Sequence, residues 1–200
     1  MSDKSTKYPI LIAVTGASGI LYVETLLEQL DKLDKEVHLI VSENAKKVMK
    51  FEKVDLTAFS NIKYIFDPKK VEAPPASGST KYSAMVIIPC SMNSLAAMAS
   101  GITLNLIHRA ADCFLKQKRT LIICPRESPL STIHLKNMFE LSKAGAVIFP
   151  LMPAFYQEPK DIRELLYNLT ARIIDLLGFD VQDVKDWQDI YRKKEGYEGA

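Results

Sequence analysis

The chain has 200 residues, of which 48% are hydrophobic and 25% are charged, and this composition excludes a disordered or low-complexity protein. Its 26 basic and 24 acidic residues give a net charge of +2, too balanced to indicate binding to nucleic acid or to an anionic membrane. No apolar run approaches the roughly 18 residues that a membrane-spanning helix needs. Three cysteines without metal-type spacing fit a reducing compartment. We therefore expect a cytoplasmic protein.

The first forty residues have the pattern of a β-α-β unit. Ile10–Val14 is a short apolar run rich in branched residues, typical of a strand buried on both faces. It ends at the glycine-containing segment Thr15–Gly19. A helix is then indicated by apolar residues at helical spacing, namely Tyr22, Leu26, Leu30 and Leu33. Glu36–Val41 predicts a second strand, and Ser42 is a candidate cap for a further helix.

The alternation continues to residue 177. Further strands are expected at Met85–Pro89, Leu121–Cys124 and Ala146–Phe149, and helices at about Asn93–Ser100, Leu106–Leu115, Leu135–Ser142 and Ile162–Leu177. This order predicts a three-layer, doubly wound α/β fold, Rossmann-like or flavodoxin-like, with a mostly parallel sheet. No repeat or linker divides the chain, so we expect a single domain over residues 1–200. Its polar tail, from about residue 179, either packs on a neighbouring subunit or frays.

The segment Gly16-Ala17-Ser18-Gly19 joins the first expected strand to the first expected helix. Open α/β sheets bind ligands beyond the carboxyl ends of their strands, where a helix N-terminus offers free N–H groups to an anion. The segment lacks the third glycine of the dinucleotide fingerprint and the lysine of a P-loop. It is either an anion site or a tight turn without a ligand.

Two further segments are candidates for ligand binding. The long stretch Asp67–Tyr82 is either a binding loop or a solvated excursion. Pro89–Ser94 follows a strand and opens a helix, so its hydroxyls either bind a ligand or cap that helix. The cysteines lie in apolar surroundings and are expected to be buried thiols, and the histidines suggest neither a metal site nor a hydrolase triad.

Basic residues are placed where they could hold a phosphate. Arg109 and Lys116 are seven residues apart on one helix face, and Arg126 directly follows a strand. Arg172 interrupts the apolar pattern of the last long helix. If these groups converge, they would bind a phosphate or pyrophosphate leaving group; singly, each is also compatible with a solvated surface charge.

Together the motifs resemble those of the UbiX/Pad-type flavin prenyltransferases, from about Ile10 to Gly178. The segments that carry the resemblance are Thr15–Gly19, Ala73–Ser79, Pro89–Met92, Asn105–Asp112, Pro125–Ser131 and Met152–Tyr156. The resemblance implies a homo-oligomer, a dodecamer built from trimers, with FMN at subunit interfaces. It also implies transfer of a dimethylallyl group from dimethylallyl phosphate to reduced FMN, without a metal. The prenylated FMN would then serve a UbiD-type decarboxylase.

The resemblance also implies roles for individual residues. The positions that match FMN contacts are Gly16, Ala17, Ser18, Ser42, Ser91, Met92, Asn93, Ser94 and Arg109. Those that match the donor phosphate site are Lys116, Arg126, Tyr156 and Arg172, and those implicated in catalysis are Ser18, Glu52 and Glu127.

Four positions depart from the family pattern. They are Val23, Asn93-Ser94 and Leu104, and bulk there is expected to alter FMN affinity. With Asn93, the Met92-Asn93 pair resembles the corresponding Met-Asn loop of the related flavin-containing cysteine decarboxylases. Two alternatives therefore stand beside the main reading: an FMN-dependent decarboxylase of cysteine-containing substrates, and a flavin carrier without turnover.

Overall fold

The protein is represented by a computed structural model that describes residues 7–180 and 187–195. Six strands form one sheet in which all neighbouring strands are parallel, in the order β3-β2-β1-β4-β5-β6. The strands are β1 (Ile10–Val14), β2 (Val37–Val41), β3 (Ile62–Phe66), β4 (Ala84–Cys90), β5 (Leu121–Pro125) and β6 (Val147–Ile148). Five of them fall where the sequence predicts strands, and β3 was not expected.

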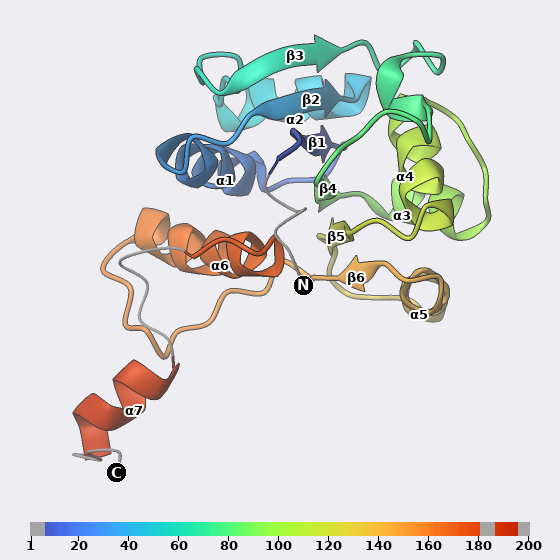
Figure 1. The fold of residues 1–200 in the computed structure, drawn as a ribbon. Coiled ribbons are helices and arrows are strands. Elements are labelled where there is room, and N and C mark those ends of the chain that lie inside the picture. The colour runs from blue at the N-terminus through green and yellow to red at the C-terminus, as the bar shows by residue number, and fades with distance from the viewer. Residues whose placement is uncertain (1–6, 181–186, 196–200) are drawn as a thin grey trace.

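Helices cover both faces of the sheet (Figure 1). They are α1 (Ile20–Lys32), α2 (Glu43–Glu52), α3 (Met92–Ala99), α4 (Leu106–Lys116), α5 (Thr132–Lys143), α6 (Ile162–Leu176) and α7 (Trp187–Glu195), with a short 3-10 helix at Pro74–Ala76. The three-layer, doubly wound α/β fold predicted from the sequence is confirmed. None of the described helices is long and apolar enough to span a membrane.

The core is divided into two halves by the sheet. On β1, Ile10, Ile12 and Val14 belong to the cluster that includes α1 and α6, whereas Leu11 and Ala13 belong to the cluster that includes α3 and α4. All five residues are at most 1% exposed. This is why the strand is apolar at every position rather than at alternate ones.

Strand β3 was not predicted because it is an edge strand that is exposed on both faces. Its sequence is Ile-Lys-Tyr-Ile-Phe, and its three central residues, Lys63, Tyr64 and Ile65, are all exposed. A strand of this kind lacks the continuous apolar run by which the buried strands are found.

The segment Asp67–Tyr82 is docked on α4 at its middle, although most of its residues are exposed. Pro75 and Ala76 are buried, and the Cys113 thiol donates a hydrogen bond to the Ala76 carbonyl, 2.8 Å away. The Arg119 guanidinium donates to the carbonyls of Gly78 and Thr80, both at 2.6 Å. These contacts hold the segment in place; its role in binding a ligand stays a prediction.

The described part of the C-terminal tail is α7, which Figure 1 shows extending from the body of the fold below α6. The ring of Trp187 meets the ring of Tyr156 edge to face, with centroids 5.3 Å apart. The tail thus contacts the Met152–Tyr156 segment of its own chain. Residues 181–186 and 196–200, also part of the predicted tail, lie outside the described residues.

Candidate functional site

A cavity of about 480 Å³ lies at the carboxyl edge of the sheet. Gly16 follows β1, Ser42 follows β2, and Ser91 follows β4, and all three line this cavity together with Asn93 and Ser94. Parallel neighbouring strands bring their carboxyl ends to one edge, which is where open α/β sheets bind ligands. The structure therefore brings together five of the predicted FMN residues.

Three helices begin at this cavity. Ser42 caps α2 by accepting a hydrogen bond from the Ala45 amide at 3.1 Å. Ser91 caps α3, and the Asn105 carboxamide oxygen caps α4 by accepting from the His108 amide at 3.1 Å. Each helix start carries a partial positive charge, so their convergence favours an anionic ligand.

Thr15 joins the two strand ends beneath the cavity. Its buried hydroxyl donates to the Pro89 carbonyl at 2.9 Å and accepts from the Ser91 amide at 2.7 Å. It thereby fixes the start of α3 against the end of β1. Thr15 was not predicted as a site residue, and neither were Asn44, Asn105 and His108, which line the cavity.

Gly16 is required by a close approach between two elements. A Cβ atom at this position would lie 2.5 Å from the Cβ of Asn44 on α2, closer than real Cβ atoms come. The first turn of the fold therefore packs directly on α2. This packing accounts for the glycine with or without a ligand.

Glu52, at the end of α2, reaches the start of α1. Its two carboxylate oxygens accept hydrogen bonds from the Gly19 amide at 2.8 Å and the Ile20 amide at 2.7 Å. The carboxylate therefore occupies the anion position at the α1 N-terminus that the sequence suggested for a phosphate. Gly19 directly follows Ser18 in the chain, so Glu52 binds the backbone next to Ser18, another of the three predicted catalytic residues.

A second cavity, of about 320 Å³, contains the third predicted catalytic residue. Arg126 and Glu127, which follow β5, line it together with Leu151 and Met152. Leu151 also lies near Gly19, where an added Cβ would be 3.8 Å from its Cδ1 atom. The second cavity thus adjoins the turn to which Glu52 binds.

Within one chain, two members of the predicted donor phosphate set lie at opposite ends of β5. Lys116 ends α4, before β5 begins, whereas Arg126 follows β5. Five strand residues rising about 3.3 Å each separate these two ends of the sheet by roughly 17 Å. Arg172 is exposed on α6, and Tyr156 contacts the α7 residue Trp187.

Arg109, predicted to contact FMN, is held on the surface of α4. Its guanidinium pairs with the Asp112 carboxylate one helical turn away, at 2.8 Å. Of the other predicted FMN residues, Ala17 and Ser18 lie in the turn between Gly16 and Gly19, and Met92 is the first residue of α3.

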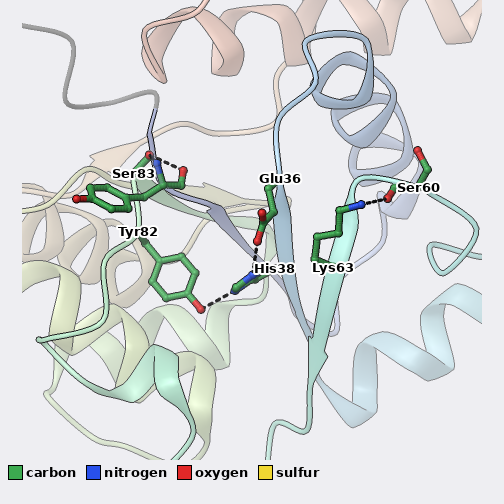
Figure 2. A network of polar contacts seen from close by, with 7 residues as sticks. Glu36, His38, Ser60, Lys63, Tyr82 and Ser83 are labelled. Carbon is green, nitrogen blue, oxygen red and sulfur yellow. Dashed lines mark hydrogen bonds and ion pairs between the residues drawn. The ribbon is translucent and has the colours of Figure 1, made fainter.

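The other reactive side chains are engaged in the fold. Burial raises the pKa values of the Cys90 and Cys124 thiols well above their usual range, so neither is a thiolate nucleophile. His38 is held between the Tyr82 hydroxyl at 2.8 Å and the Glu36 carboxylate at 3.0 Å, as Figure 2 shows. Among the described residues, no group of three or more His, Cys, Asp or Glu side chains could hold a metal ion.

Comparisons with known proteins agree with an FMN-type site. The family model described as Flavoprotein matches residues 1–173. The flavin prenyltransferase UbiX of Methanocaldococcus jannaschii is 43% identical over 182 residues, covering 89% of this chain and 97% of the relative.

Solved structures are similar over most of the chain. AnUbiX (PadA1), in complex with FMN and dimethylallyl pyrophosphate, has a TM-score of 0.87 at 39% identity, covering 90% of this chain and 97% of that chain. A dodecameric FMN-dependent Ubix-like decarboxylase from Escherichia coli O157:H7 has a TM-score of 0.85 at 36% identity, covering 90% and 99%. The peptidyl-cysteine decarboxylase EpiD, at 18% identity and a TM-score of 0.53 over 73% of this chain and 87% of that chain, shares the fold alone.

Proposed function

Since the chain belongs to the Flavoprotein family and, within it, to the UbiX-type flavin prenyltransferases, we propose that it transfers a dimethylallyl group from dimethylallyl phosphate to reduced FMN. In this reaction the allylic C–O bond breaks, and phosphate leaves with the bonding electron pair. The dimethylallyl carbons bond to the flavin and close a fourth ring. The observation that carries the proposal is the polar cavity at three helix starts, whose lining residue Gly16 lies in the same β1–α1 turn as Ser18 and as Gly19, the partner of Glu52.

The residues of the larger cavity fit FMN. Its volume of about 480 Å³ lies in the range of small-molecule sites. The capped helix starts at Ser42, Ser91 and Asn105 would hold the phosphate, and the side chains of Asn93 and Ser94 offer partners for the ribityl hydroxyls. When bound, reduced FMN supplies the electron-rich ring that accepts the dimethylallyl group.

Proton transfer is assigned to the carboxylates at the carboxyl edge of the sheet. Closing a ring on the flavin requires one proton to be delivered and another removed. Glu52 is fixed by two backbone amides, so its carboxylate has a defined position beside Ser18. Glu127 lines the adjoining cavity, where it can exchange protons with the same region.

We propose that the donor site is shared between subunits. Lys116 and Arg126 lie at opposite ends of β5, which supports a phosphate site that takes them from different chains. We therefore propose that Lys116, Arg126, Tyr156 and Arg172 meet at interfaces of a homo-oligomer, a dodecamer built from trimers. There they would stabilise the negative charge that develops on the leaving phosphate.

The product, prenylated FMN, would be used by a UbiD-type decarboxylase in the cytoplasm. The two alternatives differ from this reading in the donor chemistry. A decarboxylase of cysteine-containing substrates is favoured by Asn93 in the cavity wall, but it has no use for the four donor residues. A flavin carrier would need neither those residues nor the fixed carboxylate of Glu52.

Mass spectrometry of the flavin tests the proposal. The protein is incubated without oxygen with reduced FMN and either dimethylallyl phosphate or dimethylallyl diphosphate, and the flavin is released and weighed. We expect a flavin heavier by one dimethylallyl unit. Unmodified FMN retained by a folded protein with both donors would contradict the proposal. The double variant Arg126→Ala, Tyr156→Phe is the control, since it should keep FMN and lose use of the donor.

A further inference from the structure

His108 is a buried residue of the larger cavity that none of the predicted roles includes. It lies in the first turn of α4, is 4% exposed, and lines the cavity together with Ile102, Leu104 and Asn105. Its backbone amide is used by the Asn105 cap. The imidazole ring makes a separate contact with the loop that precedes α4.

The ring holds the chain that leads into α4. The Leu104 amide donates a hydrogen bond to the Nδ1 atom of His108, with 3.3 Å between the nitrogens. Nδ1 can accept only if it carries no proton, so the ring is neutral and its proton is on Nε2. Burial also lowers the pKa of His108, which favours this neutral form.

The segment held in this way is an apolar wall of the cavity, which we call the lip (Ile102–Leu104). The side chains of Ile102 and Leu104 are 51% and 70% exposed, although both residues line the cavity. The Ile102 amide is bound to the Ala97 carbonyl at 2.8 Å, and the Leu106 amide to the Pro68 carbonyl at 2.8 Å. Between these two anchors, the His108 contact sets the position of the Leu104 backbone.

A purely structural role does not account for the histidine. Its Nε2 atom is buried and has no hydrogen-bond partner among the described residues. A buried donor without an acceptor destabilises the fold, whereas a leucine at this position would leave no such donor. Within the part of the chain that the structure describes, the ring makes one hydrogen bond, to Leu104, and we attribute the benefit of the histidine to it.

We propose that His108 is a positioning residue that holds the lip against the flavin cavity, an inference that rests on the proposed FMN site. An apolar wall fixed beside three polar helix starts matches the two ends of FMN, a flat ring system and a phosphate. If the lip is released, the ring system loses its wall while the phosphate keeps its partners. FMN affinity should then fall without loss of the chemistry.

Three variants of His108 separate the acceptor from the size of the side chain. His108→Asn keeps an acceptor at the position of Nδ1, His108→Gln moves the acceptor one bond outward, and His108→Leu removes it. FMN binding is measured on the full-length protein by quenching of flavin fluorescence. The loss of one neutral hydrogen bond changes an equilibrium constant by about fivefold. We expect Kd to rise about fivefold in the Leu and Gln variants and to stay near the wild-type value in the Asn variant.

Steady-state kinetics and the flavin spectrum distinguish positioning from general damage. In His108→Leu the KM for reduced FMN should rise about fivefold, while kcat at saturating flavin stays unchanged. The absorption band of bound FMN should shift towards that of free FMN, and His108→Asn should restore it. Equal FMN affinity in wild type and His108→Leu, or equal losses in all three variants, would overturn the inference.

A substitution at Leu104 tests the same hydrogen bond in case the His108 variants do not fold. Leu104→Pro removes the donating amide itself, and it should raise the Kd for FMN by a similar factor. Combined with His108→Leu, it should cause no further loss, because both changes break the same contact. Fully additive losses would refute the inference. A wild-type protein that binds no FMN would refute the proposed function itself, and the inference with it.

Discussion

Replacing Glu52 tests the contact that the structure places at the start of α1. Glu52→Ala removes a carboxylate that accepts hydrogen bonds from two backbone amides, at 2.8 and 2.7 Å. Gly19 precedes the helix and makes no side-chain cap, so the Gly19 and Ile20 amides lose their protein partner. The variant should therefore be destabilised as well as inactive.

The size of this loss can be estimated from the contacts. A helix-capping side chain contributes about 0.5–2 kcal/mol, and a hydrogen bond to a charged group about 1.5–3 kcal/mol. Because Glu52 is only partly buried, water recovers part of the loss, and we expect about 2 kcal/mol for Glu52→Ala. For a chain of this length, that corresponds to a fall in Tm of about 4–8 °C.

Glu52→Gln separates capping from proton transfer. The amide keeps one acceptor oxygen, so about half of the stability should remain, roughly 1 kcal/mol. An amide has no carboxyl proton to exchange, so both variants should lose the formation of prenylated FMN alike. Thermal unfolding followed by circular dichroism and product formation followed by mass spectrometry measure the two effects.

The matched control is Glu140→Ala. Glu140 lies on α5 in an exposed pair with Lys143, and its loss should cost at most about 0.5 kcal/mol. If Glu52→Ala melts at the same temperature as Glu140→Ala, the carboxylate does not cap α1. If Glu52→Gln retains full activity, Glu52 does not transfer the proton.

Three further predictions concern the docked segment, the histidines and the subunit interface. Arg119→Ala removes two hydrogen bonds to the Asp67–Tyr82 segment, so trypsin should cleave that segment at least about tenfold faster. Unchanged cleavage would show that other contacts hold the segment. Burial lowers the pKa values of His38 and His108 below the usual 6.5, so the unfolded chain takes up protons first as the pH falls. The free energy of unfolding should therefore decrease as the pH falls below 6.5. A double variant that lacks both imidazoles should show a weaker dependence of Tm on pH between pH 7.5 and 5.5. Lys116→Ala and Arg126→Ala proteins, each inactive alone, should recover about a quarter of the wild-type activity when their subunits are mixed at random, because a quarter of the sites then receive both intact residues. Mixtures that stay inactive would mean that one chain supplies both groups.

The strands were predictable from sequence where burial is complete. Five of the six strands were expected, because a strand covered on both faces is apolar at every position. Strand β3 was missed because it lies at the edge of the sheet with Lys63 and Tyr64 exposed. Helix α5 begins before its apolar pattern, at Thr132, because Ser131 and His134 form a reciprocal cap there.

The candidate site was predictable to the extent that it depends on single elements. Ser42 and Ser91 each follow a strand and cap the next helix, so the sequence alone indicated both. The contact of Glu52 with Gly19 joins residues 33 positions apart, and it depends on the packing of α2 beside α1. His108 gave no signal because its role depends on the path of the preceding loop and on burial, which a single sequence does not reveal.

The strand order has a consequence for how the chain folds as it is made. Strand β1 lies inside the sheet between β2 and β4, yet β4 begins at Ala84, 70 residues after β1 ends at Val14. Until β4 leaves the ribosome, one edge of β1 has no partner, and at about 5–20 residues per second that interval lasts several seconds. An open, wholly apolar strand edge is a site for wrong pairing with other nascent chains. Synthesis slowed between these two strands should therefore lower the yield of native protein.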